Sequence, residues 1–236
     1  MEYQVIISLL TLIALEIVLG IDNVVFISIT ASKLPETQQK KARQLGLVLA
    51  GILRMGLLLL ISFILKLEKD LFTIFEQGFS GKDLVLIAGG LFLLYKSTSE
   101  IYHKMEVVKG SETKATTTTT FGRVIIQILM MDLVFSIDSV ITAIGIVKEI
   151  WVMYIAIIVT VGIMMFAAEP VNNFVKKHPA FKMLALSFLL LIGFSLISEG
   201  FGIEIPKGYI YFSMAFSLLV DIFQMNVNKK PTEPHV

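Results

Sequence analysis

Two ten-residue stretches decide the fold of this chain: EIVLGIDNVV at residues 16–25 and DLVFSIDSVI at residues 132–141. They align without a gap at an offset of 116 residues, and both contain an acid, three residues, a small residue, Ile, Asp and a small polar residue. Each lies inside a long apolar run, where an Asp at mid-membrane costs about 2.5–3.5 kcal/mol. The recurrence of two costly acids at the same spacing predicts an internal repeat with a functional role.

The chain around these motifs is 56% hydrophobic and 17% charged, with a mean hydropathy of +0.82. Soluble domains have about 45–50% apolar and about 25% charged residues, so an ordinary soluble enzyme is excluded. The net charge of +1 gives no reason to expect a nucleic-acid partner. We expect the N-terminal run to be retained as a span, because no basic segment of a signal peptide precedes it. Seven runs have membrane length: residues 3–31, 44–65, 83–102, 123–147, 151–175, 183–199 and 208–225.

The loop charges predict the orientation. Thirteen basic residues lie on one side: Lys33, Lys40, Lys41, Arg43, Lys104, Lys109, Lys114, Arg123, Lys176, Lys177, Lys182, Lys229 and Lys230. The other side has five: Lys66, Lys69, Lys82, Lys148 and Lys207. Cytoplasmic loops are enriched in Lys and Arg, so we predict a multi-pass protein with its N-terminus outside and its C-terminus in the cytoplasm.

Spans 3 and 6 also correspond, at an offset of 99 that aligns Glu100 with Glu199. We find no convincing match between spans 2 and 5. Three crossings reverse the side of the membrane, so the two halves would have opposite orientations, as in many secondary transporters. We therefore predict an all-α polytopic membrane protein, a 3+3 inverted repeat plus a seventh helix, forming a single transmembrane domain over residues 1–236. Its parts are expected at 1–102 (first repeat), 103–121 (cytoplasmic linker), 122–203 (second repeat) and 204–236 (seventh helix and cytoplasmic tail).

Four acids lie well inside the motif spans: Glu16, Asp22, Asp132 and Asp138. Ionised and unpaired, they would cost on the order of 10 kcal/mol, so they must be paired, protonated or bound to an ion. A purely structural role would need Arg54 and Lys96, the two basic residues inside spans, and two cations cannot neutralise four anions. The acids thus favour an ion site or pathway, with the discontinuous helices of transporters as one arrangement.

The helix geometry leaves two arrangements open. Six residues correspond to about 9 Å of rise and about 600° of turn, so the two acids of a motif point about 120° apart on an intact helix. A break at Gly20 or Ser136 would bring them into one cavity. Two straight helices would instead place separate acids along a path.

Carboxylates, amides and hydroxyls are hard oxygen donors that suit Mn²⁺, Mg²⁺ or Ca²⁺. The absence of Cys, and of His within the spans, disfavours zinc and copper. We expect no permanently bound cofactor. The candidate ligands are Asp22, Asp138, Glu16, Asp132, Asn23 and Ser139. Gating or proton-pathway candidates are Glu100, Glu199, Glu169, Arg54 and Lys96. Lys96 and Glu100 also fit an ordinary i,i+4 ion pair, and Glu169 also fits a partner for Arg54 or an interfacial acid.

The motifs EIVLGIDNVVF (16–26) and DLVFSIDSV (132–140), with AEPVNNFVKKHPAFKMLALSFLLLIG from Ala168 and EGFGIEIPKGYIYFSMAFSLLVD ending at Asp221, resemble the TerC family of bacterial integral membrane proteins, named for tellurium resistance. The resemblance covers nearly the whole chain. It implies a divalent-metal exporter of the inner membrane, mainly for Mn²⁺, in a superfamily of small inverted-repeat transporters that includes the LysE exporters. The second motif begins with Asp132 where the first has Glu16, which shortens the reach of one ligand.

The leading hypothesis is therefore a secondary transporter that exports Mn²⁺, with Ca²⁺ or Mg²⁺ as less favoured substrates and protons as a counter-ion. No HExxH, GxSxG, Walker A or GxGxxG motif is present, so we do not expect an enzyme. Two alternatives remain: a membrane partner or scaffold in tellurite or envelope-stress resistance, and a metal-loading factor for secreted enzymes. The expected partners are the lipid bilayer and a divalent ion, with membrane-protein partners and oligomeric state left open.

Overall fold

The computed structural model describes residues 2–60, 70–74, 77–108, 119–147 and 149–227. Seven helices lie in these ranges: α1 (Glu2–Ala31), α2 (Glu36–Leu59), α4 (Gly81–Val108), α5 (Phe121–Ile146), α6 (Ile150–Lys177), α7 (Pro179–Gly200) and α8 (Lys207–Val227). Each corresponds to one predicted apolar run, and six of them, all but α8, are long and apolar enough to span a membrane. The chain is an all-helical polytopic membrane protein, and the crossing by α8 stays a prediction.

Some element boundaries differ from the sequence prediction. α2 begins directly after Pro35, before the predicted start at 44, because the polar residues that precede the apolar run are also helical. α4 continues to Val108, inside the linker predicted at 103–121, since no Gly or Pro ends the helix there. The rest of that linker, 109–118, lies outside the described residues. A short antiparallel pair, β1 (Asp70–Ile74) and β2 (Gln77–Ser80), precedes α4 where we expected only a loop.

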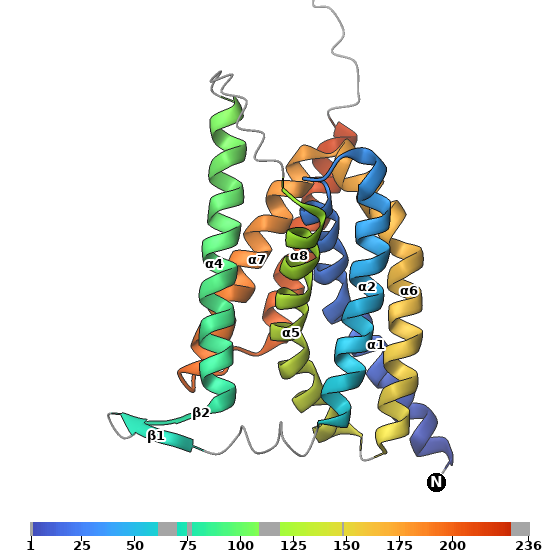
Figure 1. Ribbon diagram of the computed structural model, residues 1–236, viewed down its shortest axis with the longest axis vertical. Helices are drawn as coiled ribbons and strands as arrows, with labels where there is room; N and C mark the ends of the chain where they lie inside the picture. Colours follow the sequence, from blue (N-terminus) through green and yellow to red (C-terminus); the bar gives the residue numbers. More distant parts are fainter. Residues whose placement is uncertain (1, 61–69, 75–76, 109–118, 148, 228–236) are drawn as a thin grey trace, which may run out of the picture.

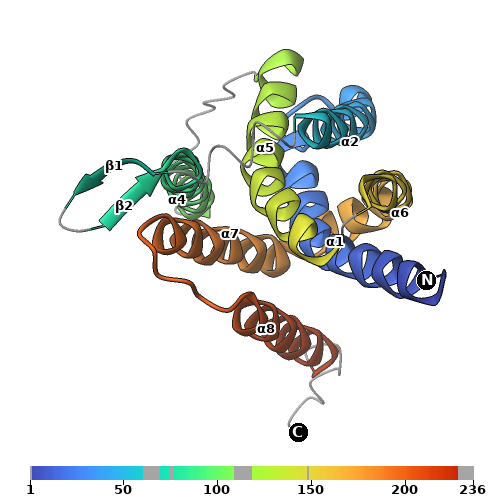
Figure 2. The same ribbon diagram turned by 90° about the horizontal axis from the view of Figure 1, so that it is seen from below.

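The two helices that carry the motifs lie at the centre of the bundle. α1, α4, α6 and α8 run in one direction, and α2, α5 and α7 run in the other, so α1 and α5 are antiparallel (Figure 1). α1 packs on α6, α2 packs on α5, and α4 packs on α7, while α1 and α5 also contact each other (Figure 2). α1 and α5 both contribute side chains to each of the three buried apolar clusters. The motifs therefore sit in the most enclosed part of the fold.

Both motif helices are continuous. α1 runs unbroken through Gly20, and α5 runs unbroken through Ser136, so the straight-helix alternative describes this structure. Gly20 packs against α6, where the Cε of Met164 occupies the space that a Cβ at position 20 would need. A small residue here lets α1 and α6 approach closely, as small residues do between membrane helices.

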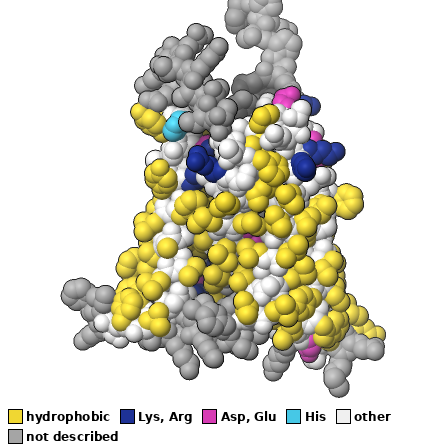
Figure 3. Space-filling model, viewed as in Figure 1, with side chains coloured by type: hydrophobic (Ala, Val, Ile, Leu, Met, Phe, Trp, Pro, Cys, Tyr) yellow, Lys and Arg dark blue, Asp and Glu magenta, His cyan; other side chains and the backbone are white. Residues whose placement is uncertain are grey.

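The outer surface agrees with a membrane location. Apolar side chains cover the middle of the bundle, and basic side chains gather at one end (Figure 3). Phe166 is 86% exposed and Phe212 is 72% exposed, an arrangement that suits contact with lipid rather than water. The basic end is where the α1–α2 loop and the C-terminal end of α6 lie (Figures 1 and 3). Its assignment to the cytoplasm stays a prediction.

Candidate functional site

A buried triad of charged residues joins both motifs to α2: Glu16 on α1, Asp132 on α5 and Arg54 on α2. Arg54 Nη1 donates to Glu16 Oε2 at 2.8 Å, and Nη2 donates to Asp132 Oδ1 at 2.5 Å. All three side chains are 5% exposed. Since Glu16 and Asp132 are equivalent positions of the repeat, one guanidinium connects the same position of the two motifs. The triad carries two negative charges and one positive charge.

Asp132 accepts more of the hydrogen bonds of the described residues than Glu16 does. Arg54 Nε lies 3.2 Å from Asp132 Oδ1, and Asn23 Nδ2 donates to the same oxygen at 3.4 Å. The Ser136 hydroxyl donates to Oδ2 at 3.1 Å. A buried carboxylate needs such a set of donors, because the desolvation of an ion costs several kcal/mol. Ser136 therefore supports Asp132 in an intact helix.

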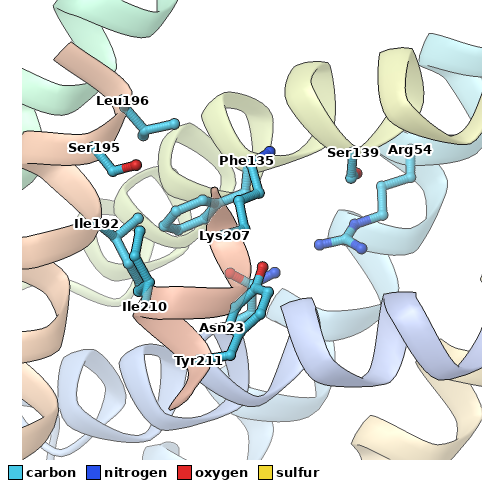
Figure 4. Close-up of a pocket in the computed structure, with 10 residues that line it drawn as sticks. All are labelled: Asn23, Arg54, Phe135, Ser139, Ile192, Ser195, Leu196, Lys207, Ile210 and Tyr211. Carbon is cyan, nitrogen blue, oxygen red and sulfur yellow. The ribbon is translucent and has the colours of Figure 1, made fainter. Parts of the chain in front are cut away.

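The second pair of equivalent positions lines one small cavity beside the triad. Asn23 of α1 and Ser139 of α5 face it together with Arg54, and Figure 4 shows these side chains converging from α1, α2 and α5. The Ser139 hydroxyl also donates to the Ser136 carbonyl at 3.3 Å. The cavity volume is about 50 Å³, which has room for a few water molecules. The remaining lining comes from α5, α7 and α8: Phe135, Ile192, Ser195, Leu196, Lys207, Ile210 and Tyr211.

The two acids expected to bind metal most directly, Asp22 and Asp138, are described only in their backbone, as parts of α1 and α5. Their side chains lie outside the described part of the structure, so their role as ligands stays a prediction. Among the side chains that the structure does describe, no group of three or more His, Cys, Asp or Glu residues comes together. Glu16 and Asp132 contact a guanidinium here, so a metal could reach them only after Arg54 moves away.

The gating candidates lie apart from the triad, near the ends of their helices. Glu100 pairs with Lys96 at 3.1 Å, which is the i,i+4 alternative, and also with Lys33 from the α1–α2 loop. Glu199 pairs with Lys82 at 3.3 Å.

Glu169 on α6 pairs with Arg43 on α2 at 2.7 Å, whereas the expected partner Arg54 binds the motif acids. Arg43 lies in the first half of α2, nearer the basic end than Arg54. The Glu169 ion pair therefore belongs to that end of the α2–α6 contact and not to the triad.

The chain matches the family model described as Integral membrane protein TerC family over residues 1–233. The chain belongs to the TerC family. It is similar to a UPF0053 protein of Haemophilus influenzae, with 49% identity over 223 residues that cover 94% of each chain. It is also similar to the UPF0053 inner membrane protein YgdQ of Escherichia coli K12, with 48% identity over 220 residues, 93% of this chain and 92% of YgdQ.

A longer relative shares the same region. The UPF0053 inner membrane protein YoaE of Escherichia coli K12 is 49% identical over 216 residues, which are 92% of this chain and 42% of YoaE. No solved structure matches this TerC family chain. The fold is therefore described from this chain's own helices.

The sequence analysis did not identify three polar residues of this cavity: Ser195 on α7, and Lys207 and Tyr211 on α8. Ser195 is a single hydroxyl in an apolar run, a weak signal because such hydroxyls often bond their own helix. Lys207 and Tyr211 are four residues apart at the start of the helix that we placed outside the repeat. Their i,i+4 spacing on one helix face was the available signal.

Proposed function

We propose that this TerC family chain is a secondary transporter of the bacterial inner membrane that exports a divalent metal ion, Mn²⁺, through a site between α1 and α5. One observation carries the proposal: equivalent positions of the two motifs meet in pairs. The first acids of both motifs share Arg54, and Asn23 and Ser139 line the same cavity. Asp22 and Asp138 directly precede Asn23 and Ser139, so they are the acids nearest in sequence to the cavity.

The cavity supports a small ion as the substrate. Ligand pockets for organic molecules usually measure about 300–1,000 Å³, whereas this cavity has about 50 Å³. The side-chain amide of Asn23 and the hydroxyl of Ser139 are hard oxygen donors, as carboxylates are. Two carboxylates would neutralise a divalent ion, and these donors with water would complete about six ligands. Mn²⁺ accepts this set, and it is the ion that the family resemblance implies.

The helix pairing supports transport by an inverted repeat. If α1, α2 and α4 correspond to α5, α6 and α7, the contact of α1 with α6 has its counterpart in the contact of α5 with α2, and both are present. The corresponding helices also run in opposite directions (Figure 1). A two-fold axis in the membrane plane would pass near the α1–α5 crossing, where such transporters bind their substrates. Rocking of one half against the other would then expose the site to either side.

Arg54 has a defined part in this proposal. It pairs with both Glu16 and Asp132 and offsets one of their two negative charges while the site is empty, and a divalent ion beside it would be repelled unless two further carboxylates balance the charge. Protonation of Glu16 or Asp132 would release one arm of the guanidinium. This release would couple proton binding on the triad to metal release from the neighbouring cavity. The basic end of the bundle would face the cytoplasm. Mn²⁺ would enter the protein from the cytoplasm at this end and be exported to the other side.

The test is transport by the purified protein in liposomes loaded with a Mn²⁺-sensitive dye. Asp22→Asn and Asp138→Asn keep the size of the side chain but remove a charge, and we expect each to reduce transport at least about tenfold. Asp221→Asn on α8 is the matched control, an acid outside both motifs, and should transport normally. Added Ca²⁺ or Mg²⁺ should compete less well than unlabelled Mn²⁺. Normal transport by both motif variants would refute the site. No transport by the wild-type protein would favour the scaffold alternative.

A further inference from the structure

A group of three lysines and one glutamate lies at the basic end of the bundle, away from the triad. Lys33 lies in the α1–α2 loop, Lys96 and Glu100 lie on α4, and Lys182 lies in the first turn of α7. We call these four residues the lysine cluster. Glu100 Oε1 accepts from both Lys33 and Lys96, the latter at 3.1 Å. When all three lysines are protonated, three positive charges thus face one negative charge.

The surplus positive charge is partly withdrawn from water. The side chains of Lys33, Lys96 and Glu100 are 29%, 17% and 15% exposed. Burial, followed by the charges of Lys96 and Lys182, lowers the pKa of Lys33 to about 7. Among the ion pairs of the described residues, Glu100 is the one acid that pairs with these lysines. A further anion would therefore improve the electrostatics of this end of the protein.

Glu199, the acid that aligns with Glu100 in the sequence, lies at the opposite end of the α4–α7 pair. It has an ion pair with Lys82 at 3.3 Å. In the sequence, thirteen of the basic residues belong to the end predicted to be cytoplasmic and five to the other. Lys82 provides a matched control position.

An apolar cavity of about 320 Å³ lies between α1, α7 and α8, and its lining includes a residue of the first turn of α7, at the same end of the bundle as the cluster. Phe181, which lines it, is the direct neighbour of Lys182 in the sequence. Phe26 on α1 also lines it and lies about 7.5 Å of helix rise before Ala31, where α1 ends two residues ahead of Lys33. The cavity therefore lies at the depth of the lipid chains in the same leaflet. Further lining comes from Val18, Val25, Ala185, Phe188, Leu189, Met214, Ala215 and Leu218, and from Tyr211, which also lines the small cavity beside the triad.

We infer that this end of the protein binds one anionic phospholipid, with its phosphate on the lysine cluster and an acyl chain in the apolar cavity. The surplus of positive charge gives the complementarity that a phosphate needs, and basic pockets between membrane helices are known sites for anionic headgroups. The apolar cavity offers a surface for an acyl chain, which a lipid has and a free phosphate lacks. The inference does not rest on the proposed transport activity, because neither the cluster nor this cavity includes the triad; Tyr211 is the lining residue that the two cavities share.

Lipid binding to the full chain, purified and delipidated in an uncharged detergent, tests the inference by native mass spectrometry. Long-chain phosphatidylglycerol should bind with one molecule retained per chain. Phosphatidylcholine of the same chain length should bind far less, because its headgroup has no net charge. Inorganic phosphate should produce no stabilisation against heat. Equal retention of both lipids would refute the inference in favour of a non-selective lipid layer, and stabilisation by phosphate alone would refute it in favour of a free-anion site.

Three variants separate the headgroup site from the chain site. Lys33→Gln combined with Lys182→Gln should weaken phosphatidylglycerol binding by about tenfold or more, whereas Lys82→Gln should leave it unchanged. Ala185→Trp fills the apolar cavity and should weaken binding of the long-chain lipid but not of dihexanoyl phosphatidylglycerol. If the double variant does not purify as a single species, the contrast between chain lengths in Ala185→Trp decides. Unchanged long-chain binding in Ala185→Trp would overturn the inference.

Discussion

The α1–α5 and α4–α7 contacts each join two helices whose sequences align with each other, yet one contact is charged and the other is mainly apolar. The α1–α5 contact encloses a carboxylate–guanidinium–carboxylate triad with 5% exposure. In the α4–α7 contact, the backbones approach at Gly90 and Gly193, and the acids Glu100 and Glu199 lie towards opposite ends. Charge at mid-membrane is expensive, whereas glycine contacts and terminal charges are not. On the proposed function, we expect α1 and α5 to form the ion site and α4 and α7 to support them.

The largest effect should come from Arg54→Gln. It leaves Glu16 and Asp132 facing each other without a cation, and breaking a buried ion pair in this way costs about 3–5 kcal/mol. We expect a large loss of folded protein, measured as the temperature at which the protein in detergent loses its monodisperse peak. Adding Glu16→Gln and Asp132→Asn should restore much of the stability but not transport.

Arg123→Gln is the control for this variant, since Arg123 is an exposed cation at the start of α5. It should leave the melting temperature nearly unchanged. If Arg54→Gln were as stable as Arg123→Gln, the triad would not stabilise the α1–α5 contact. The comparison between the two helix pairs would then lose its basis.

A smaller effect should follow from Gly90→Ala in the apolar pair. The added Cβ would lie 2.5 Å from the Gly193 carbonyl oxygen and 2.6 Å from Ile197 Cγ1. Overpacking of this kind costs about 1–3 kcal/mol, and backbone cannot move aside as a side chain can. We expect a lower melting temperature with normal transport per folded molecule.

Gly162→Ala on α6 controls for the change in helix propensity. A Cβ at Gly162 meets no atom within 4 Å, so this variant should be neutral or slightly stabilising. Reduced transport per folded molecule in Gly90→Ala would show that α4 and α7 take a direct part in the transport step. The division of roles between the two pairs would then be wrong.

The sequence was sufficient to predict the features that depend on composition and on the regular spacing of residues along a helix. The apolar runs predicted all seven described helices, because about 20 apolar residues in a row have few alternatives to a membrane helix. The gapless match between the motifs marked the helices that lie at the centre. The same reasoning identified the Lys96–Glu100 pair, which depends only on i,i+4 spacing.

The sequence could not predict which residues far apart in the chain contact each other. Whether Arg54 binds Glu16, Asp132 or Glu169 depends on how α2 packs, and the structure pairs it with the first two. Gly20 suggested a helix break, but a glycine also permits close approach, and Met164 occupies the space beside it. Only the packed structure shows whether a glycine such as Gly20 breaks a helix or permits close approach.

The smallest effect concerns the basic end of the α4–α7 pair, where Lys33 approaches Glu100. The pKa of Lys33 is lowered from 10.5 to about 7, so between these values the unfolded chain binds more protons than the folded chain. Stability should therefore rise with pH from about 7 towards about 10.5 through this residue, and the penalty for its charge is fully present below about 7. Because the side chain is 29% exposed, water screens the effect and the rise should be small.

The melting temperature of the lipid-free protein in uncharged detergent, measured from pH 7 to pH 9, should rise more steeply in the wild type than in Lys33→Gln. Lys41→Gln, at an exposed position of α2, should keep the wild-type slope. Identical slopes in all three proteins would show that the lysine cluster places no strain on this end of the helix pair.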